Sequence, residues 1–474
     1  MTCRGQHVVE LKNCGDGCVY SRELCQFSGS IKSPCSNEFV EIRRRNDERC
    51  WSVRVFGRIF KQLISLVHDC DNHFEVKYCD STLNVTLRHR TAVSDWFIVQ
   101  PLYIINENSD GSFQSDNCDE NKAEHALIKI NLAMQLAQCI YSSKFNENGF
   151  GELAFVLRRC KVFHSRLSID DAREMNQWEL YDATASEIVE KEGLDAVNRT
   201  KFVGFVGCTK FDGLTTDEEY SYANIKAKTF ANPALGGGFL CLMGSGCFYS
   251  WPNKIDDVAE AFRSKKSIDL STLLDDSNYR RTFGGCFATT LGALVHELGH
   301  CFDLAHTKTG LMGNDVDYIN RFFLSENLTE ILPKRIIRSC QLTEKQEMKV
   351  SIVQRFTRIK KPGTFLEKYH EQKDNDLTFF EPNCLETLRY NRWFTQCKDK
   401  DAVNFIESER KIKSANSELK LVELRELETN NSMLVKFWRV DVNEFSIPSS
   451  IDLRNKMIFA VTSCGDVFKK DFAN

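Results

Sequence analysis

The sequence has little proline and no long apolar run. Proline accounts for only 8 of the 474 residues, which argues against long disordered linkers. No stretch of about 18 apolar residues occurs, so we expect no transmembrane helix. The first residues also lack the basic start and the apolar segment of a signal peptide. These absences predict a cytoplasmic protein and leave secretion by a non-standard route open.

An excess of one charge sign is absent as well. The chain carries 62 lysines and arginines against 66 aspartates and glutamates, a formal net charge of −4. Nucleic-acid-binding domains are usually strongly basic, so we expect no nucleic-acid partner. The hydrophobic fraction of 42% and the charged fraction of 27% are those of an ordinary globular protein. Because the length exceeds what one hydrophobic core serves, we expect two or three domains.

The 20 cysteines include no Cys-x-x-Cys pair, which argues against a cysteine-rich structural zinc module. Cysteines are dense near the start of the chain, where they would suit a disulfide framework in an exported protein. Further on they are single and fall in predicted helices and strands, where a thiol packs as a small apolar group. Because no signal peptide is visible, we favour reduced thiols and leave the redox state of the cysteines open.

The hydrophobic pattern divides the chain into three regions. Residues 1–92 form a region rich in cysteine and strands, although its first part, up to about residue 70, shows no assignable pattern. Residues 93–400 alternate between predicted strands and helices, which indicates an α/β or α+β fold. Residues 401–474 contain short predicted strands and are expected to form a small β-rich domain.

Alternation of apolar residues predicts strands, and apolar residues three or four apart predict helices. A glycine triplet at Gly236, Gly237 and Gly238 could cradle a phosphate, but it lacks the Lys-Ser/Thr ending, so we favour a turn beside a strand. The edge of that strand could bind an extended peptide. The predicted strands are 74–78, 83–87, 96–105, 153–162, 202–206, 239–243, 421–424, 434–442 and 458–461, and the predicted helices are 124–141, 170–191, 289–302 and 344–359.

The segment His296-Glu297-Leu298-Gly299-His300 contains the residues best suited to catalysis. His296 and His300 are four residues apart, so they lie one turn apart on the same face of a helix. Their imidazoles can therefore converge on one zinc ion about 2.0–2.1 Å away. Glu297 follows the first ligand, where it can take a proton from water and pass it to a leaving amine. The pattern predicts a peptidase with one catalytic Zn²⁺ ion.

A third histidine, His306, follows where helical spacing cannot deliver it to the same ion. The chain must turn sharply near Asp303, at a position that usually holds glycine because the turn needs a positive φ. Aspartate tolerates that conformation better than most residues. Beyond His306, Gly310-Leu311-Met312-Gly313 is typical of a methionine-containing turn below a zinc site. We expect the Met312 thioether to pack beneath the three histidines without touching the metal.

Several assignments at this site stay open. Asp303 could be a ligand in place of His306, and Glu326 could be a distant carboxylate ligand. Tyr318 could donate a hydrogen bond to the oxyanion that forms during hydrolysis, although packing would explain it equally well. A thiolate at Cys301 could bind the metal, but we favour an inert thiol inside the helix. The histidines could also be ordinary hydrogen-bonded residues of a buried helix.

At these residues the chain resembles a family of proposed zinc metallopeptidases from fungi and invertebrates. The resemblance implies a metzincin-like domain with its active-site helix under a mixed sheet, one zinc ion and peptide hydrolysis, and it implies nothing about the substrate. It covers about residues 95–400 and rests on the segments 236–239, 249–252, 296–306, 310–312 and 320–322.

The sequence therefore predicts a zinc metalloendopeptidase that acts on a peptide or protein substrate. An alternative is a catalytically inactive zinc-binding scaffold whose β-rich regions bind a partner or a carbohydrate. Zinc binding without turnover of any peptide would favour that alternative. A third hypothesis, a DNA-associated protease, fits poorly with the near-neutral charge. No pattern in the sequence predicts the oligomeric state.

Overall fold

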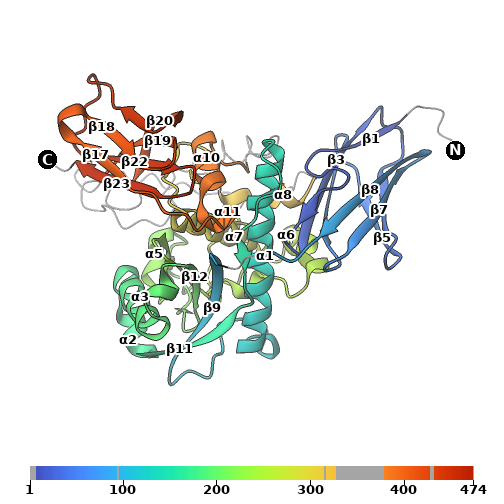
Figure 1. Cartoon of the computed structure of the whole chain (residues 1–474). Coiled ribbons are helices and arrows are strands. Elements are labelled where there is room, and N and C mark those ends of the chain that lie inside the picture. Colours follow the sequence, from blue (N-terminus) through green and yellow to red (C-terminus); the bar gives the residue numbers. More distant parts are fainter. Residues whose placement is uncertain (1–6, 93–95, 314–315, 327–377, 428–431, 473–474) are drawn as a thin grey trace, which may run out of the picture.

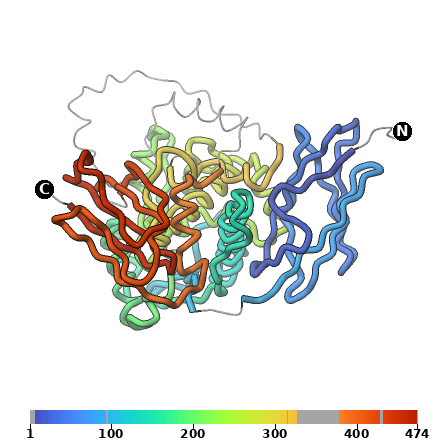
Figure 2. The backbone as a smooth tube through the Cα atoms, turned by 45° about the horizontal axis from the view of Figure 1, so that its top comes forward, coloured from blue at the N-terminus to red at the C-terminus, as the bar shows by residue number. Residues whose placement is uncertain are grey.

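A computed structural model describes residues 7–92, 96–313, 316–326, 378–427 and 432–472. Two strand-rich regions, near the ends of the sequence, lie on opposite sides of a central part that combines helices with a sheet (Figures 1 and 2). This arrangement confirms the predicted mixture of α and β structure with β-rich flanks. The predicted domain boundaries at 92/93 and 400/401 stay predictions, and the helix expected at 344–359 lies outside the described residues.

The N-terminal region consists of strands, so the expectation that its first part has no regular pattern is wrong. In β4 the exposed face includes Phe39 and the buried face includes Arg44, so the alternation of apolar and charged residues is blurred in the sequence. The predicted hairpin is confirmed as β7 and β8. Two sheets, β1-β3-β6 and β2-β8-β7-β4-β5, enclose one apolar core. The strands are β1 Val8–Leu11, β2 Val19–Tyr20, β3 Leu24–Lys32, β4 Phe39–Arg44, β5 Arg49–Arg54, β6 Ile59–Ser65, β7 Asp71–Tyr78 and β8 Ser81–His89.

The central sheet has the order β10-β9-β12-β16-β15, and β11 also pairs with β9. All of these pairs are parallel except β15 with β16, so β15 is an antiparallel strand at one end of the order. The strand predicted at 153–162 is replaced by two shorter ones, β10 and β11. The strands are β9 Ile98–Glu107, β10 Val156–Leu157, β11 Lys161–Ser168, β12 Thr200–Val206, β15 Ala234–Gly237 and β16 Leu240–Gly244, and β13 Lys210–Phe211 pairs with β14 Thr229–Phe230 apart from this sheet.

Helices cover both faces of the central sheet. Along β9, Val99 and Tyr103 join the core under α1 and α7, whereas Leu102 and Ile104 join the core under α2 and α3. The single helix predicted at 170–191 is wrong, because Asn176 caps a new helix and forms a capping box with its third residue. The helices are α1 Ala123–Glu147, α2 Ile169–Glu174, α3 Gln177–Glu192, α4 Leu194–Val197, α5 Tyr222–Ala227, α6 Val258–Arg263, α7 Phe283–Cys301 and α8 Asn320–Phe323, and a 3-10 helix, η4, covers Val316–Tyr318.

The C-terminal region begins with two helices and continues as two sheets, β17-β18-β21 and β20-β19-β22-β23. The three strands predicted here are confirmed as β19, β20 and β22. No helix of the described ranges is long and apolar enough to cross a bilayer. The elements are α10 Pro382–Tyr390, α11 Arg392–Thr395, β17 Val403–Ile406, β18 Lys411–Ser414, β19 Leu419–Glu426, β20 Met433–Val442, β21 Glu444–Ser446, β22 Lys456–Thr462 and β23 Val467–Phe472.

Candidate metal centre

Helix α7 carries the predicted histidine pair and is buried along nearly its whole length. The Thr282 side chain caps its first turn by accepting a hydrogen bond from the Gly285 N–H at 3.0 Å. In its last third, the Tyr141 hydroxyl of α1 donates to the Val295 carbonyl at 2.7 Å. A side chain at Gly292 would meet the Val316 carbonyl oxygen at 1.9 Å, so the backbone of η4 packs directly on the helix. These contacts hold the helix in place through groups outside the histidine cluster.

The structure brings His296, His300 and His306 together, with one ligating nitrogen of each within 4.8 Å of the others. The Nε2 atoms of His296 and His300 are 3.0 Å apart. Two nitrogens bound to one zinc ion in tetrahedral geometry would be about 3.3 Å apart, so the pair fits such an ion with little movement. The three residues therefore fit the donor set of a zinc site.

Hydrogen bonds orient two of the rings. His296 Nδ1 donates to the Leu311 carbonyl at 2.6 Å, and His300 Nδ1 donates to the Leu304 carbonyl at 2.9 Å. Each bond leaves the Nε2 lone pair for a metal, the arrangement usual for zinc-binding histidines. Burial lowers the pKa of His300 to about 4, so its ring is neutral at physiological pH.

The chain leaves the helix through a left-handed residue at Asp303, whose φ is +67°. This confirms the predicted sharp turn. The carboxylate of Asp303 pairs with Lys469 Nζ at 2.5 Å, and no carboxylate of the described residues joins the histidine cluster. Burial raises the pKa of Asp303, but Lys469, Lys201 and Arg425 outweigh it and hold the value below the ordinary range. The Asp303 carboxylate therefore faces the C-terminal sheet, where it pairs with Lys469.

Strand β20 holds the backbone of the third histidine. The His306 N–H donates to the Ser432 carbonyl at 3.0 Å, and the His306 carbonyl accepts from the Leu434 N–H at 2.9 Å. Arg425 of β19 donates from Nη2 to the Asp303 carbonyl at 2.9 Å. These contacts could not be predicted from the sequence, because pairing between such distant segments leaves no local pattern. The C-terminal region is therefore part of the framework of the metal centre.

Met312 packs against helix α7 and is fully buried. A side chain at Gly299, just before the second histidine, would meet the Met312 sulfur at 2.5 Å, so the thioether fills the space that the glycine leaves. The Thr307 N–H donates to the Met312 carbonyl at 2.9 Å, and Gly310 adopts a φ of +76°. The turn that carries Met312 is thus closed on itself and lies against the helix.

Glu297 is 4% exposed and lies where β15 crosses the helix. A side chain at Gly236 would meet the Glu297 carbonyl oxygen at 1.8 Å, so the strand and the helix touch through their backbones. The Tyr181 hydroxyl donates to the carbonyls of Gly237 at 2.8 Å and of Leu240 at 3.0 Å. The glycine triplet therefore forms a strand and a turn, as expected.

Three further candidates have other surroundings. Glu326 forms an ion pair with Arg263. The Arg280 guanidinium lies over the Tyr318 ring at 4.8 Å and also bonds Thr289 in the first half of α7, so the contacts of Tyr318 place it near that half. Burial raises the pKa of Cys301 to about 12, which keeps its thiol protonated. The assignment of Tyr318 as an oxyanion donor stays a prediction.

Comparison with known proteins connects this geometry to a family. A family model described as "Putative peptidase family" matches residues 8–383. A protein of Saccharomyces cerevisiae named a putative zinc metalloproteinase is 34% identical over 97 residues, which cover 20% of this chain and 14% of that protein. A protein of the same description from Schizosaccharomyces pombe is 25% identical over 239 residues, which cover 47% of this chain and 38% of that protein. The matches thus span less than half the length of either relative.

Proposed function

This chain belongs to the family described as "Putative peptidase family", and on that basis we propose that it is a zinc-dependent endopeptidase with one catalytic ion at His296, His300 and His306. The main support is the convergence of the three ligating nitrogens within 4.8 Å. The bonds from Nδ1 of His296 and His300 to backbone carbonyls add to it, because they leave both Nε2 atoms for a metal. The zinc metalloproteinase names of the yeast relatives are consistent with the same ion.

Glu297 is the proposed general base. A bound Zn²⁺ ion would polarise the scissile carbonyl and lower the pKa of a water molecule. Glu297 follows the first ligand on the buried helix, so its carboxylate can accept a proton from the attacking water. It then delivers that proton to the departing amine as the carbon–nitrogen bond breaks. Met312 packs against α7 at Gly299 and takes no part in the proton transfers.

The proposed substrate is an extended peptide segment. Strand β15 is at one end of the sheet order, and it crosses α7 at Glu297. A peptide that lies along this strand would pass the proposed base. Such a path accepts the interior of a chain, which supports cleavage of internal bonds.

Zinc analysis of three variants, combined with a peptide-library digest, tests this proposal. Glu297→Gln should keep the zinc content of the wild type, whereas its hydrolysis rate should fall at least about 100-fold because the base is lost. His306→Ala should lose one equivalent of zinc together with activity. The exposed His164 on β11 gives the matched control, and His164→Ala should change neither quantity.

Each result bears on one part of the proposal. Cleavage by the Glu297→Gln variant would show that another residue is the base, and full zinc content in the His306→Ala variant would remove His306 from the ligand set. If the wild type holds zinc at this cluster but cleaves no peptide, the inactive scaffold is the correct function.

A further inference from the structure

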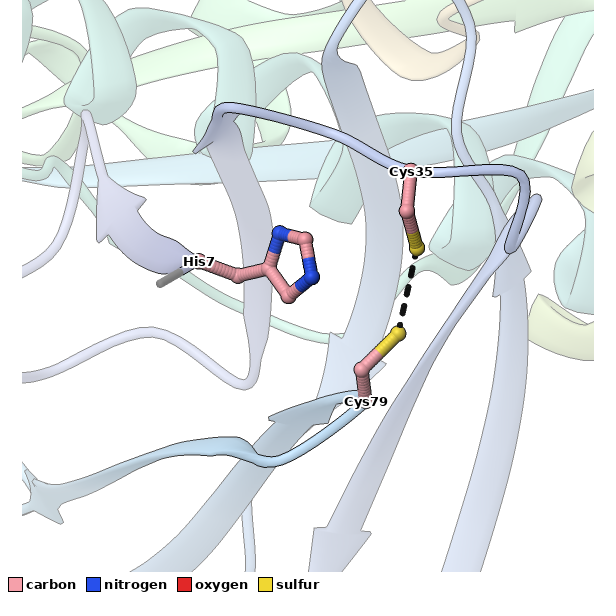
Figure 3. A group of neighbouring side chains, drawn as sticks. All are labelled: His7, Cys35 and Cys79. Carbon is pink, nitrogen blue, oxygen red and sulfur yellow. Dashed lines mark hydrogen bonds between the residues drawn. The ribbon is translucent and has the colours of Figure 1, made fainter. Parts of the chain in front are cut away.

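A second group of metal-binding side chains lies in the N-terminal region. His7, Cys35 and Cys79 each offer one ligand atom, and these atoms lie within 4.8 Å of one another. Figure 3 shows the imidazole and the two sulfurs turned toward a common space. The two sulfur atoms are 3.3 Å apart. The group is separate from the histidine cluster, and neither the family description nor the names of the relatives refers to it.

The imidazole of His7 is oriented by a hydrogen bond from Nδ1 to a backbone carbonyl, as are those of His296 and His300. Its Nδ1 donates to the Ser33 carbonyl at 2.5 Å, and the residue is 9% exposed. The Nε2 atom, on the side of the ring that faces the sulfurs in Figure 3, therefore keeps its lone pair. The Tyr78 ring packs edge-on against the imidazole, with 5.4 Å between the ring centroids, and restricts its rotation.

Asn37 directs one hydrogen-bond donor at each of the two sulfurs. Its backbone N–H points at Cys35 Sγ at 3.4 Å, and its side-chain amide points at Cys79 Sγ at 3.6 Å. Hydrogen bonds from outer groups of this kind hold metal-binding side chains in position. The thiolate is the form of cysteine that binds metals.

The backbone takes unusual conformations to bring these groups together. Cys79 occupies the two-residue turn between β7 and β8 with a φ of +51°, a position that favours glycine or asparagine. Ser33, whose carbonyl holds the His7 ring, has a φ of +54°. Cysteine is not among the residue types preferred in turns, so a preference for turn formation does not explain Cys79. A ligand role explains the cysteine.

We propose that His7, Cys35 and Cys79 bind a thiophilic metal ion, with zinc as the natural occupant. Two thiolates bound to one zinc ion at about 2.3 Å in tetrahedral geometry would be about 3.8 Å apart, so the sulfurs need to separate by only about half an ångström. Imidazole and thiolate donors select zinc over magnesium or calcium. These three ligands, the ones that the described residues supply, leave a fourth coordination position on the ion.

The ion would join the two N-terminal sheets at one end. His7 immediately precedes β1 in the first sheet, Cys79 lies at a turn of the second, and Cys35 lies in the segment between β3 and β4 that connects them. A metal that binds only the assembled site adds its binding free energy to the stability of the fold. The site is therefore a structural cross-link, and the sequence did not reveal it because its ligands come from three separated segments.

Zinc content distinguishes this site from the histidine cluster. Wild-type protein purified under reducing conditions should hold about two zinc equivalents, and the double variant Cys35→Ser/Cys79→Ser should hold about one. The exposed Cys50 of β5 provides the matched control, since Cys50→Ser removes a thiol and should keep both equivalents. The variant His296→Ala/His300→Ala should also hold about one equivalent, because it leaves the N-terminal site intact.

Cobalt substitution tests the site without altering its ligands. The variant His296→Ala/His300→Ala loaded with Co²⁺ should show the intense near-ultraviolet absorption of thiolate-to-cobalt charge transfer, which a site made of histidines cannot produce. Absence of this absorption, or zinc content in the double cysteine variant equal to that of the wild type, would overturn the proposal. A Cys35–Cys79 disulfide found by peptide mass in the protein purified under reducing conditions would also overturn it. Failure of the peptidase assay leaves all of these results unaffected.

Discussion

Replacing Arg425 with methionine should weaken both the C-terminal sheet and the metal centre. Arg425 is 3% exposed and donates from Nε to Glu423 Oε2 at 2.6 Å and from Nη2 to the Asp303 carbonyl at 2.9 Å. Its guanidinium also lies 3.6 Å from the centroid of the Phe459 ring. Glu423 is fully buried, so Arg425→Met leaves a carboxylate without its cationic partner inside the protein.

The size of the effect follows from the burial of this pair. Removing one partner of a buried ion pair costs about 3–5 kcal/mol, because the remaining charge is left uncompensated. At about 2–4 °C per kcal/mol, the midpoint of the affected thermal transition should fall by roughly 6–20 °C. The double variant Arg425→Met/Glu423→Gln removes both charges and should recover most of this loss. Asn383, which donates to Glu423 at 2.8 Å, can donate equally to the glutamine oxygen.

The affinity for zinc should fall in both variants, whereas the loss of stability should be large only in Arg425→Met. Both variants lose the donor to the Asp303 carbonyl, which holds the turn between His300 and His306. Groups that orient metal ligands typically contribute 10- to 100-fold to affinity, so both variants should bind zinc at the histidine cluster about 10- to 100-fold more weakly. Circular dichroism measures the midpoints, and competition with a chelator measures the affinity. Equal midpoints for the single and double variants, or unchanged zinc affinity in both, would refute this reasoning.

Two other substitutions test packing and pH dependence. Gly236→Ala places a methyl group 1.8 Å from the Glu297 carbonyl oxygen, so it should separate β15 from α7, lower the free energy of unfolding by about 1–3 kcal/mol and reduce peptide hydrolysis. Urea unfolding and the peptide digest measure these two effects. A Gly236→Ala variant with the stability and activity of the wild type would contradict the close contact between β15 and α7. Burial lowers the pKa of Lys129 from 10.5 to about 8, a cost of about 3 kcal/mol to the folded state at pH 7. Between pH 8 and 10.5 the unfolded chain binds more protons, so this cost declines as pH rises. Lys129→Met removes this cost but also loses the hydrogen bond to the Trp251 carbonyl, which contributes about 1 kcal/mol. The substitution should therefore raise the free energy of unfolding by about 2 kcal/mol at pH 7. At about pH 10, urea unfolding should show almost no difference in stability between Lys129→Met and the wild type. A variant less stable than the wild type at pH 7 would contradict the lowered pKa of Lys129.

The sequence predicts the parts of this fold and site that depend on local spacing. The pair His296 and His300 follows from helical periodicity, and the left-handed Asp303 follows from the need to return His306 to the same ion. The helix break at Asn176 also has a local signature, because Asn176 and Glu179 form a capping box.

Contacts between distant segments were not predictable in this way. Nothing in the pattern around Ser432 or Leu434 indicates that they pair with the backbone of His306. The first strands of the N-terminal region were missed because polarity and exposure do not match along them, as in β4, where Phe39 is exposed and Arg44 is buried. The meeting of His7 with Cys35 and Cys79 depends on how two sheets pack, which spacing along the chain does not encode.

The pairing of His306 with β20 has a consequence for biosynthesis. A ribosome translates Met433–Val442 well after the three histidines, so the third of them has no backbone partner while the intervening chain is being made. Until β20 emerges, the nascent chain holds two histidines on a helix and a third on an unanchored loop. The third ligand of the proposed metal centre would therefore gain its backbone anchor only after β20 has been translated.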